Sequence, residues 1–258
     1  MIVQSLWIGE TLTDMEVYCI KSFIKNGFDF HLYTYEPVKR VPKGTKIKDG
    51  NKIISKNKIF QLKNTFLPFS DIWRYKLLYL KGGYWVDMDM ICMKPFDFKE
   101  PYVFSSERTI KEGAYKMSVP YVANIGVLKA PKGSTFYKEL YEKCMEHENK
   151  KDNKDKIKYM RILREMIVKY KYKKYIKSPE YFCHLDWWYA KDAFMTLKSY
   201  RGKYGHPGKS VQSFFTKKKV YTIHFWRDLV TKKYKLDTDA DYDEDSLWEK
   251  IKLYVDHL

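Results

Sequence analysis

Residues 70–89 read SDIWRYKLLYLKGGYWVDMD, and this stretch decides the fold that we expect. Its first part has apolar residues at helical spacing, which predicts a helix from an N-cap at Ser70 to about Lys81. The two glycines that follow end the helix. Tyr84-Trp85-Val86 then predicts a short buried strand, and Asp87 comes directly after it.

Asp87 and Asp89 carry the chemistry of this stretch. Ligands of open α/β sheets bind beyond the carboxyl ends of the strands, and successive side chains alternate in direction. We therefore expect both carboxylates to face one cleft while Met88 faces the core. Two neighbouring carboxylates repel unless a cation lies between them, and oxygen ligands suit Mg²⁺ or Mn²⁺. Such an ion can stabilise a diphosphate leaving group.

Asp71 and Arg74 lie three residues apart in the predicted helix and share one face. An ion pair within the helix explains them without any function. Their place directly before the glycine turn favours a role in the cleft.

The rest of the chain predicts one α/β domain over residues 1–258. An apolar run ends at Gly9, a helix capped by Thr13 or Asp14 reaches about Asn26, and a second strand follows. This order indicates a parallel sheet of the Rossmann type. The expected strands are residues 2–8, 28–35, 84–86, 102–105, 121–128 and 220–225; the other expected helices are 134–175 and 246–258; residues 36–58 are expected to be mainly loop.

A second alternation of aspartates occupies residues 237–245. It resembles the start of a calcium loop, but Tyr242 stands at the glycine position and Trp248 at the final glutamate position. We interpret it as a solvated loop that leads to a helix cap at Asp245 or Ser246. The pair at Asp87 and Asp89 differs because it follows a buried strand.

Composition sets the alternatives for function. The chain has 49 Lys+Arg against 32 Asp+Glu, a net charge of +17, and 17% aromatic residues. This balance fits nucleotide phosphates, nucleic acid, an anionic membrane or glycan, or simply a lysine-rich surface. No helix-turn-helix, zinc-finger or RNP signature supports nucleic-acid binding. A metal-dependent phosphotransferase or nuclease that uses the same aspartate pair is a further alternative, but the chain has no P-loop and no second acidic cluster placed for two metals.

Cellular context follows from cysteines and apolar runs. The four cysteines at 19, 92, 144 and 183 are far apart, so neither a zinc site nor a disulfide framework is expected. No signal peptide or membrane-spanning run is visible. We expect a cytoplasmic protein, with peripheral membrane contact as an alternative.

Residues 138–177 carry 14 basic and 7 acidic residues, a net +7, and are expected to be helical. Apolar residues such as Ile162, Leu163 and Ile167 are interleaved with the charges. This pattern is typical of helices on anionic membrane or glycan surfaces. It fits equally a helical lid whose apolar face packs on the main domain.

The stretch 70–89 resembles the DXD sugar-binding segment of glycosyltransferase family 32 and of its capsular-polysaccharide-synthesis relatives. A similar arrangement occurs in the large clostridial glucosylating toxins. The resemblance extends over most of the chain and is densest over residues 1–130. It is carried by four further segments: 4–9, 30–35, 124–127 and 178–183, and by Ile223-His224-Phe225-Trp226.

The resemblance implies a GT-A fold, which is one Rossmann-like α/β domain with a mostly parallel central sheet flanked by helices. Residues 1–130 would bind the nucleotide-sugar, and residues 131–258 would supply acceptor-side helices and a metal-ligand strand. It also implies retention of anomeric configuration, and no side chain is assigned as nucleophile. The biosynthesis of a polysaccharide is the implied setting.

The resemblance also implies roles for single residues. Trp7 would stack on the base, and Asp71, Arg74, Asp87 and Asn124 would contact the donor. The metal would be bound by Asp89, His224 and Asp87, with both aspartates essential.

Three of these residues have a purely structural alternative: Trp7 and His224 as core side chains, and Asn124 as a strand-end cap. The chain departs from its relatives after His224, and Arg227 or Lys232 is expected to supply the positive charge for the phosphates. The ends of distant strands meet at one edge of a parallel sheet, so His224 can reach Asp89.

The sequence thus predicts a metal-dependent glycosyltransferase. We expect Mn²⁺ or Mg²⁺, a UDP-sugar in preference to a GDP-sugar, and a growing glycan as acceptor. Nucleic acid is not expected as a partner. Residue patterns do not identify the sugar, the acceptor, the linkage or the oligomeric state.

Overall fold

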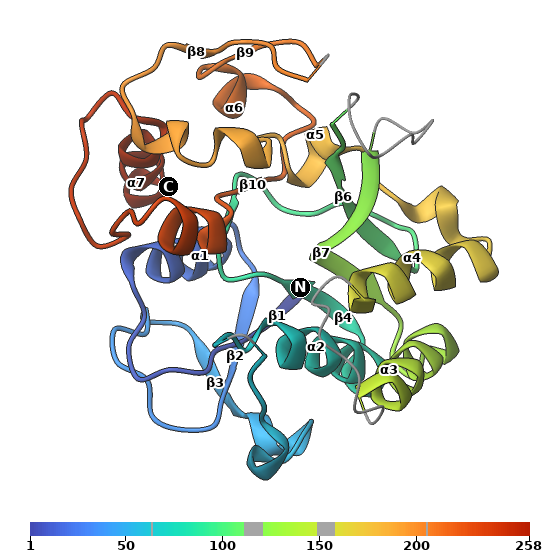
Figure 1. Cartoon of the computed structure of the whole chain (residues 1–258). Coiled ribbons are helices and arrows are strands. Elements are labelled where there is room, and N and C mark those ends of the chain that lie inside the picture. The colour runs from blue at the N-terminus through green and yellow to red at the C-terminus, as the bar shows by residue number, and fades with distance from the viewer. Residues whose placement is uncertain (63, 111–120, 149–157, 205) are drawn as a thin grey trace.

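The computed structural model describes residues 1–62, 64–110, 121–148, 158–204 and 206–258. Its centre is a six-stranded sheet in the order β3-β2-β1-β4-β7-β6 (Figure 1). These strands are β1 (Ile2–Leu6), β2 (Asp29–Thr34), β3 (Lys46–Asp49), β4 (Gly83–Val86), β6 (Val103–Arg108) and β7 (Tyr121–Ala130). The first four in this order are parallel, whereas β7 is antiparallel to β4 and to β6. The predicted α/β class with a mostly parallel sheet is confirmed.

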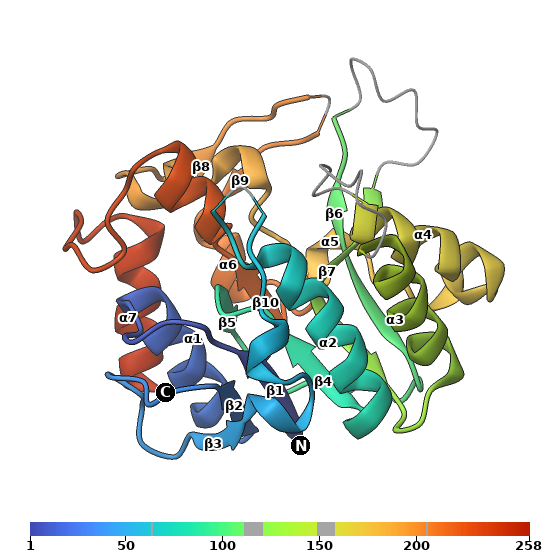
Figure 2. The same ribbon diagram turned by 60° about the horizontal axis from the view of Figure 1, so that its bottom comes forward.

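Helices cover both faces of this sheet, with α1 and α7 on one side and α2, α3 and α4 on the other (Figures 1 and 2). The helices are α1 (Asp14–Lys25), α2 (Leu67–Lys81), α3 (Thr135–Glu148), α4 (Lys158–Lys169), α5 (Pro179–Phe182), α6 (Ser213–Thr216) and α7 (Leu247–His257). Alternate strand residues enter separate apolar layers: Val86 packs on the α1 side and Trp85 on the α2 side.

Smaller elements complete the described chain. Short 3₁₀ turns occupy Gly50–Lys52, Lys56–Lys58, Tyr172–Tyr175, Trp187–Tyr189 and Asp192–Phe194, and a π-helical turn occupies Leu229–Lys233. Two antiparallel pairs lie outside the central sheet: β5 (Met90–Cys92) with β10 (Thr222–His224), and β8 (Ser199–Tyr200) with β9 (Lys209–Ser210). The predicted strand at 220–225 is therefore present but belongs to a pair of its own.

The helix in the quoted stretch begins earlier than expected. It starts at Leu67 with Pro68 in its first turn, where a missing N–H has no cost, and Ser70 is not its cap. Its end at Gly82 is as predicted. Gly82 has a φ of 64°, and a Cβ there would come within 2.4 Å of the Lys132 backbone nitrogen, so only glycine fits.

The expectation of mainly loop over residues 36–58 is wrong for β3, which pairs in parallel with β2. Its sequence, Lys-Ile-Lys-Asp, shows no apolar face because β3 is an edge strand that is largely exposed. Backbone pairing with β2 stabilises this strand without burial of its side chains. The sequence therefore has no alternation of apolar residues there that would predict a strand.

The helical region predicted for residues 134–175 folds as α3, α4 and a 3₁₀ turn, and its part at 149–157 lies outside the described residues. On α4, the side chains of Leu163, Met166 and Ile167 are buried against the protein. This part of the apolar face is therefore used for packing, as the alternative of a packed helix predicted. None of the helices in the described ranges combines the length and apolarity needed to cross a bilayer.

Candidate active site

Asp87 lies where β4 leaves the sheet. Its N–H donates to the Gly126 carbonyl of β7 at 2.8 Å, and the chain then turns so that the Met90 N–H donates to the Asp87 carbonyl at 3.2 Å. Met88 is buried against the core, as predicted, but it also forms part of the wall of the cleft that the two aspartates line. Asp89 comes at the end of this turn, directly before β5, and only 9% of it is exposed.

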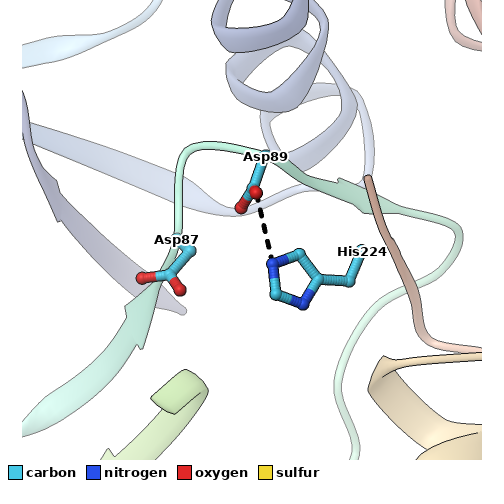
Figure 3. Close-up of side chains that lie close together, drawn as sticks. All are labelled: Asp87, Asp89 and His224. Atoms are coloured by element: carbon cyan, nitrogen blue, oxygen red, sulfur yellow. Dashed lines mark ion pairs between the residues drawn. The ribbon is translucent and has the colours of Figure 1, made fainter. Parts of the chain in front are cut away.

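His224 meets Asp89 because β10 pairs with β5. The antiparallel register places His224 opposite Met90, the residue next to Asp89. His224 Nε2 lies 3.2 Å from Asp89 Oδ2. One ligand atom from each of Asp87, Asp89 and His224 lies within 4.8 Å of the others, around one space (Figure 3). The expected meeting is observed, but an antiparallel pair produces it and not the edge of a parallel sheet.

Arg74 holds Asp87 in place. Its Nη1 contacts Asp87 Oδ1 at 2.5 Å, and the Trp85 indole N–H donates to the same oxygen at 2.8 Å. Nη2 of Arg74 lies 3.0 Å from Asp71 Oδ1. Burial raises the pKa of Asp87 although Arg74 opposes this, and burial raises the pKa of Asp71 to about 7. This guanidinium thus lies between two carboxylates, the buried Asp71 and the half-buried Asp87.

Asp89 is held in its ionised form. Its Oδ2 accepts a hydrogen bond from the Arg227 N–H at 2.8 Å. Burial acts to raise the pKa of Asp89, but the charge and hydrogen bond of His224 lower it overall. Burial acts to lower the pKa of His224, but the charge and hydrogen bond of Asp89 raise it well above the usual 6.5. Asp89 and His224 thus each favour the charged form of the other.

These residues line a cleft of about 430 Å³. Trp7, Arg74, Asp87, Asp89 and His224 all face it, as expected for residues that contact a ligand. Further lining residues come from two segments, 64–70 and 226–232, and include both cations considered for phosphate contact, Arg227 and Lys232.

Trp7 forms part of the cleft wall just beyond β1. It is half-buried, and the Arg227 guanidinium carbon lies 5.3 Å from its ring centroid. Lys232 enters the cleft from the π-helical turn, and its Nζ donates to Thr65 Oγ1 at 3.1 Å. An aromatic face and two cations thus lie in the same cleft as the carboxylates.

Two of the predicted donor-contacting residues are not in the cleft lining. Asp71 lies behind Arg74 and is 6% exposed. Asn124 lies within β7, where its amide contacts Glu107 Oε2 and Cys183 Sγ, both at 3.3 Å, and its Oδ1 accepts a hydrogen bond from Ser105. Both residues support neighbours of the cleft from inside the protein.

Sequence reasoning misses several residues around the site. Trp226 stacks on His224 with centroids 3.9 Å apart, and it has a φ of 57°. The Cys183 thiol lies 3.7 Å from Nδ1 of His224. Trp85 has a signal in the sequence, because residues 85 and 87 alternate onto one side of an extended chain. Glu16, whose Oε1 lies 2.5 Å from Nε of the cleft residue Arg227, has none, since it reaches the site only through the tertiary fold.

The aspartates at 237–245 lie in a loop before α7, as predicted. Asp239 pairs with Arg40 at 2.6 Å, and the side chain of Asp241 is 99% exposed. Ser246 is the N-cap of α7 and accepts a hydrogen bond from the Glu249 N–H at 3.2 Å. Within the described residues, the group at Asp87, Asp89 and His224 is the one cluster suited to a metal ion.

One comparison with known protein families agrees with a DXD site. Residues 11–110 match a family described as "Glycosyltransferase sugar-binding region containing DXD motif". A search of curated proteins finds no match. The chain is similar to a solved structure described as "PaToxG Glycosyltransferase", with a TM-score of 0.48 and 13% sequence identity over 66% of this chain and 69% of that chain.

Proposed function

We propose that this chain is a glycosyl-transferring enzyme that uses a nucleotide-sugar and a divalent cation; its residues 11–110 match the family of sugar-binding regions with a DXD motif. The observation that carries the proposal is that the DXD pair, Asp87 and Asp89, shares one cleft with His224. The mixed, mostly parallel sheet of the GT-A-like kind brings β1 and β4 side by side, so that Trp7 and Asp87 open into the same space.

The three side chains fit a divalent cation. Two carboxylates supply the oxygen ligands that Mn²⁺ and Mg²⁺ prefer, and a neutral imidazole completes a mixed set. Asp89 and His224 would hold the ion directly. Among the described contacts of Asp87, Arg74 and Trp85 both use Oδ1, which leaves Oδ2 for a ligand. When bound, the cation offsets the charge of the departing nucleotide.

The other cleft residues suit the parts of a UDP-sugar. The Trp7 ring offers a face on which a uracil base stacks. Arg227 and Lys232 offer positive charge for the two phosphates. Arg74 and Asp87, in the same cleft, would position the sugar through its hydroxyl groups. Asp71, from its place behind Arg74, holds that guanidinium, and Asn124 secures β7 beside the site.

An acceptor hydroxyl then attacks the anomeric carbon from the face that the nucleotide diphosphate leaves: the new C–O bond replaces the bond to the phosphate oxygen, and the hydroxyl proton goes to the departing diphosphate. We propose a glycan acceptor and retention of the anomeric configuration, both of which rest on the resemblance to glycosyltransferase family 32. A product analysis by NMR checks the configuration of the new bond. An inverted product contradicts retention and leaves the site assignment intact.

A thermal-shift panel tests the proposed function. With Mn²⁺ present, a saturating UDP-sugar should raise the Tm by about 3 °C or more, because a ligand of the folded state stabilises it. An oligonucleotide at the same charge concentration should not. A shift with the oligonucleotide alone would favour nucleic-acid binding, and no shift with any nucleotide-sugar would contradict the proposal.

A further inference from the structure

Glu16 is a buried carboxylate outside the cleft lining. It lies in the first turn of α1, and 0% of its side chain is exposed. Its Oε2 accepts hydrogen bonds from the N–H of Thr13 at 2.8 Å and from the Thr13 hydroxyl at 2.6 Å. Its Oε1 lies 2.5 Å from Nε of Arg227. The two oxygens thus serve two separate parts of the molecule.

The contact with Thr13 does not explain the negative charge of Glu16. This contact forms a capping box with the N-cap residue, and glutamine serves in such a box as well as glutamate does. A buried charge is unfavourable unless a partner of opposite charge accompanies it. The pair with Arg227 is therefore the feature that requires a carboxylate at this position.

Arg227 connects this pair to the cleft. Its N–H donates to Asp89 Oδ2, and its guanidinium lies over the ring of Trp7. The residue before it, Trp226, stacks on His224. Glu16 contacts Nε, at the near end of the guanidinium, and the two Nη groups at its far end are not part of this pair. A guanidinium held in this way can direct its Nη groups at an anion in the cleft.

We propose that Glu16 is a positioning residue for the phosphates of the nucleotide. It holds Nε of Arg227, keeps the guanidinium over Trp7, and so directs the Nη groups at the diphosphate. The identity of the anion rests on the proposed function. The position of the guanidinium does not, and the two parts can be tested separately.

The sharpest variant is Glu16→Gln, which keeps an oxygen for the capping box and removes the charge. In EDTA, so that no metal contributes, UDP should bind about tenfold or more weakly than to the wild type, as expected for the loss of one oriented charged contact. Uridine, which has no phosphate, should bind equally to both proteins. Unchanged UDP binding, or an equal loss for uridine, would overturn the proposal.

Asp14→Asn is the matched control. It removes a carboxylate from the same helical turn, but Asp14 pairs with Arg40 away from the cleft. UDP should bind to this variant as to the wild type. An equal loss of affinity in Asp14→Asn would mean that any charge removed from this turn has the same effect, which contradicts a specific role for Glu16.

A double variant tests whether Glu16 acts through Arg227. Glu16→Gln combined with Arg227→Met should bind UDP no more weakly than Arg227→Met alone, because the effect of Glu16 requires the guanidinium. Additive losses would contradict the proposal. If Glu16→Gln alone does not fold, UDP binding is compared between the double variant and Arg227→Met instead. The double variant removes both charges of the pair, so neither is left buried without a partner.

A crystal structure of nucleotide-free Glu16→Gln separates the two parts. In this variant the Arg227 guanidinium should no longer lie over the Trp7 ring. A guanidinium that is still over the ring would overturn the proposal. If the guanidinium moves but the wild type binds no UDP, the positioning role holds and the proposed function fails.

Discussion

Asp87-Met88-Asp89 and the aspartates at 237–245 share an alternation of carboxylates, but their surroundings differ. The first pair follows a buried strand, and its side chains contact Arg74, Arg227 and His224. The second stretch lies in a surface loop, in which Asp239 pairs with Arg40 and the side chain of Asp241 is exposed to solvent. The same spacing of aspartates thus occurs with two different sets of neighbours.

This difference shows what turns a D-x-D spacing into a site. Solvated carboxylates repel one another weakly and need no cation, whereas buried ones need positive partners. At the first pair these partners come from α2, β10 and the segment after β10. The second stretch has mainly a structural task, since Asp239 also accepts a hydrogen bond from the Asp14 N–H at the start of α1. The following predictions test this division.

The largest effect is expected for Asp89→Asn. Sugar transfer should fall by about a hundredfold or more, because an oriented ligand of the metal and of the transition-state charge is lost. The melting temperature should stay near that of the wild type. Asp241→Asn, the matched change in the exposed stretch, should leave the rate of transfer unaltered. Equal losses in the two variants would contradict the comparison.

His224→Ala should weaken Mn²⁺ binding by about tenfold or more, as calorimetry can measure. A proton and a cation compete for Nε2, so the affinity of the wild type for Mn²⁺ should fall as the pH falls. Because Asp89 raises the pKa of His224 well above 6.5, this fall should already begin above that pH. His257→Ala, at the exposed end of α7, is the control. An affinity for Mn²⁺ that does not change with pH in the wild type would exclude the imidazole as a ligand.

Trp7→Ala should weaken UDP binding by about 1–3 kcal/mol, the range for stacking of a base on an aromatic ring. Trp187→Ala, which changes a half-buried tryptophan outside the cleft lining, should not alter UDP binding. Quenching of tryptophan fluorescence by UDP gives the affinities. Unchanged affinity in Trp7→Ala would place this residue among the core side chains.

The smallest effect is expected for Asp239→Asn in the second stretch. The loss of the exposed pair with Arg40 should reduce the free energy of unfolding by about 1 kcal/mol or less. Urea denaturation measures this change, and Mn²⁺ binding should be the same as in the wild type. Weakened Mn²⁺ binding would show that the second stretch also contributes to the metal site.

Local signals explain what can be predicted from the sequence. The glycine turn, the strand before Asp87 and the cap at Ser246 are predictable because their causes lie within a few residues. β3 is not predictable, since an exposed edge strand has no apolar period. The predicted start of α2 is wrong because the prediction uses Ser70 as the N-cap, whereas the helix begins at Leu67 with Pro68 in its first turn.

Contacts between distant segments explain the rest. The meeting of His224 with Asp89 follows from the resemblance, but its geometric cause, the pairing of β10 with β5, has no sign in the sequence. Glu16 looks like an ordinary residue of a first helical turn, because its partner Arg227 joins it only in the folded protein. The positions of Asp71 and Asn124 behind the cleft lining likewise depend on packing.

A crystal structure with UDP and Mn²⁺ tests the central claim most directly. We predict one Mn²⁺ with an Asp89 oxygen and Nε2 of His224 both within about 2.5 Å, and with the diphosphate on its open side. The claim would be contradicted if His224 lay more than about 5 Å from the ion, with waters as ligands in its place, or if the ion were bound at 237–245 instead.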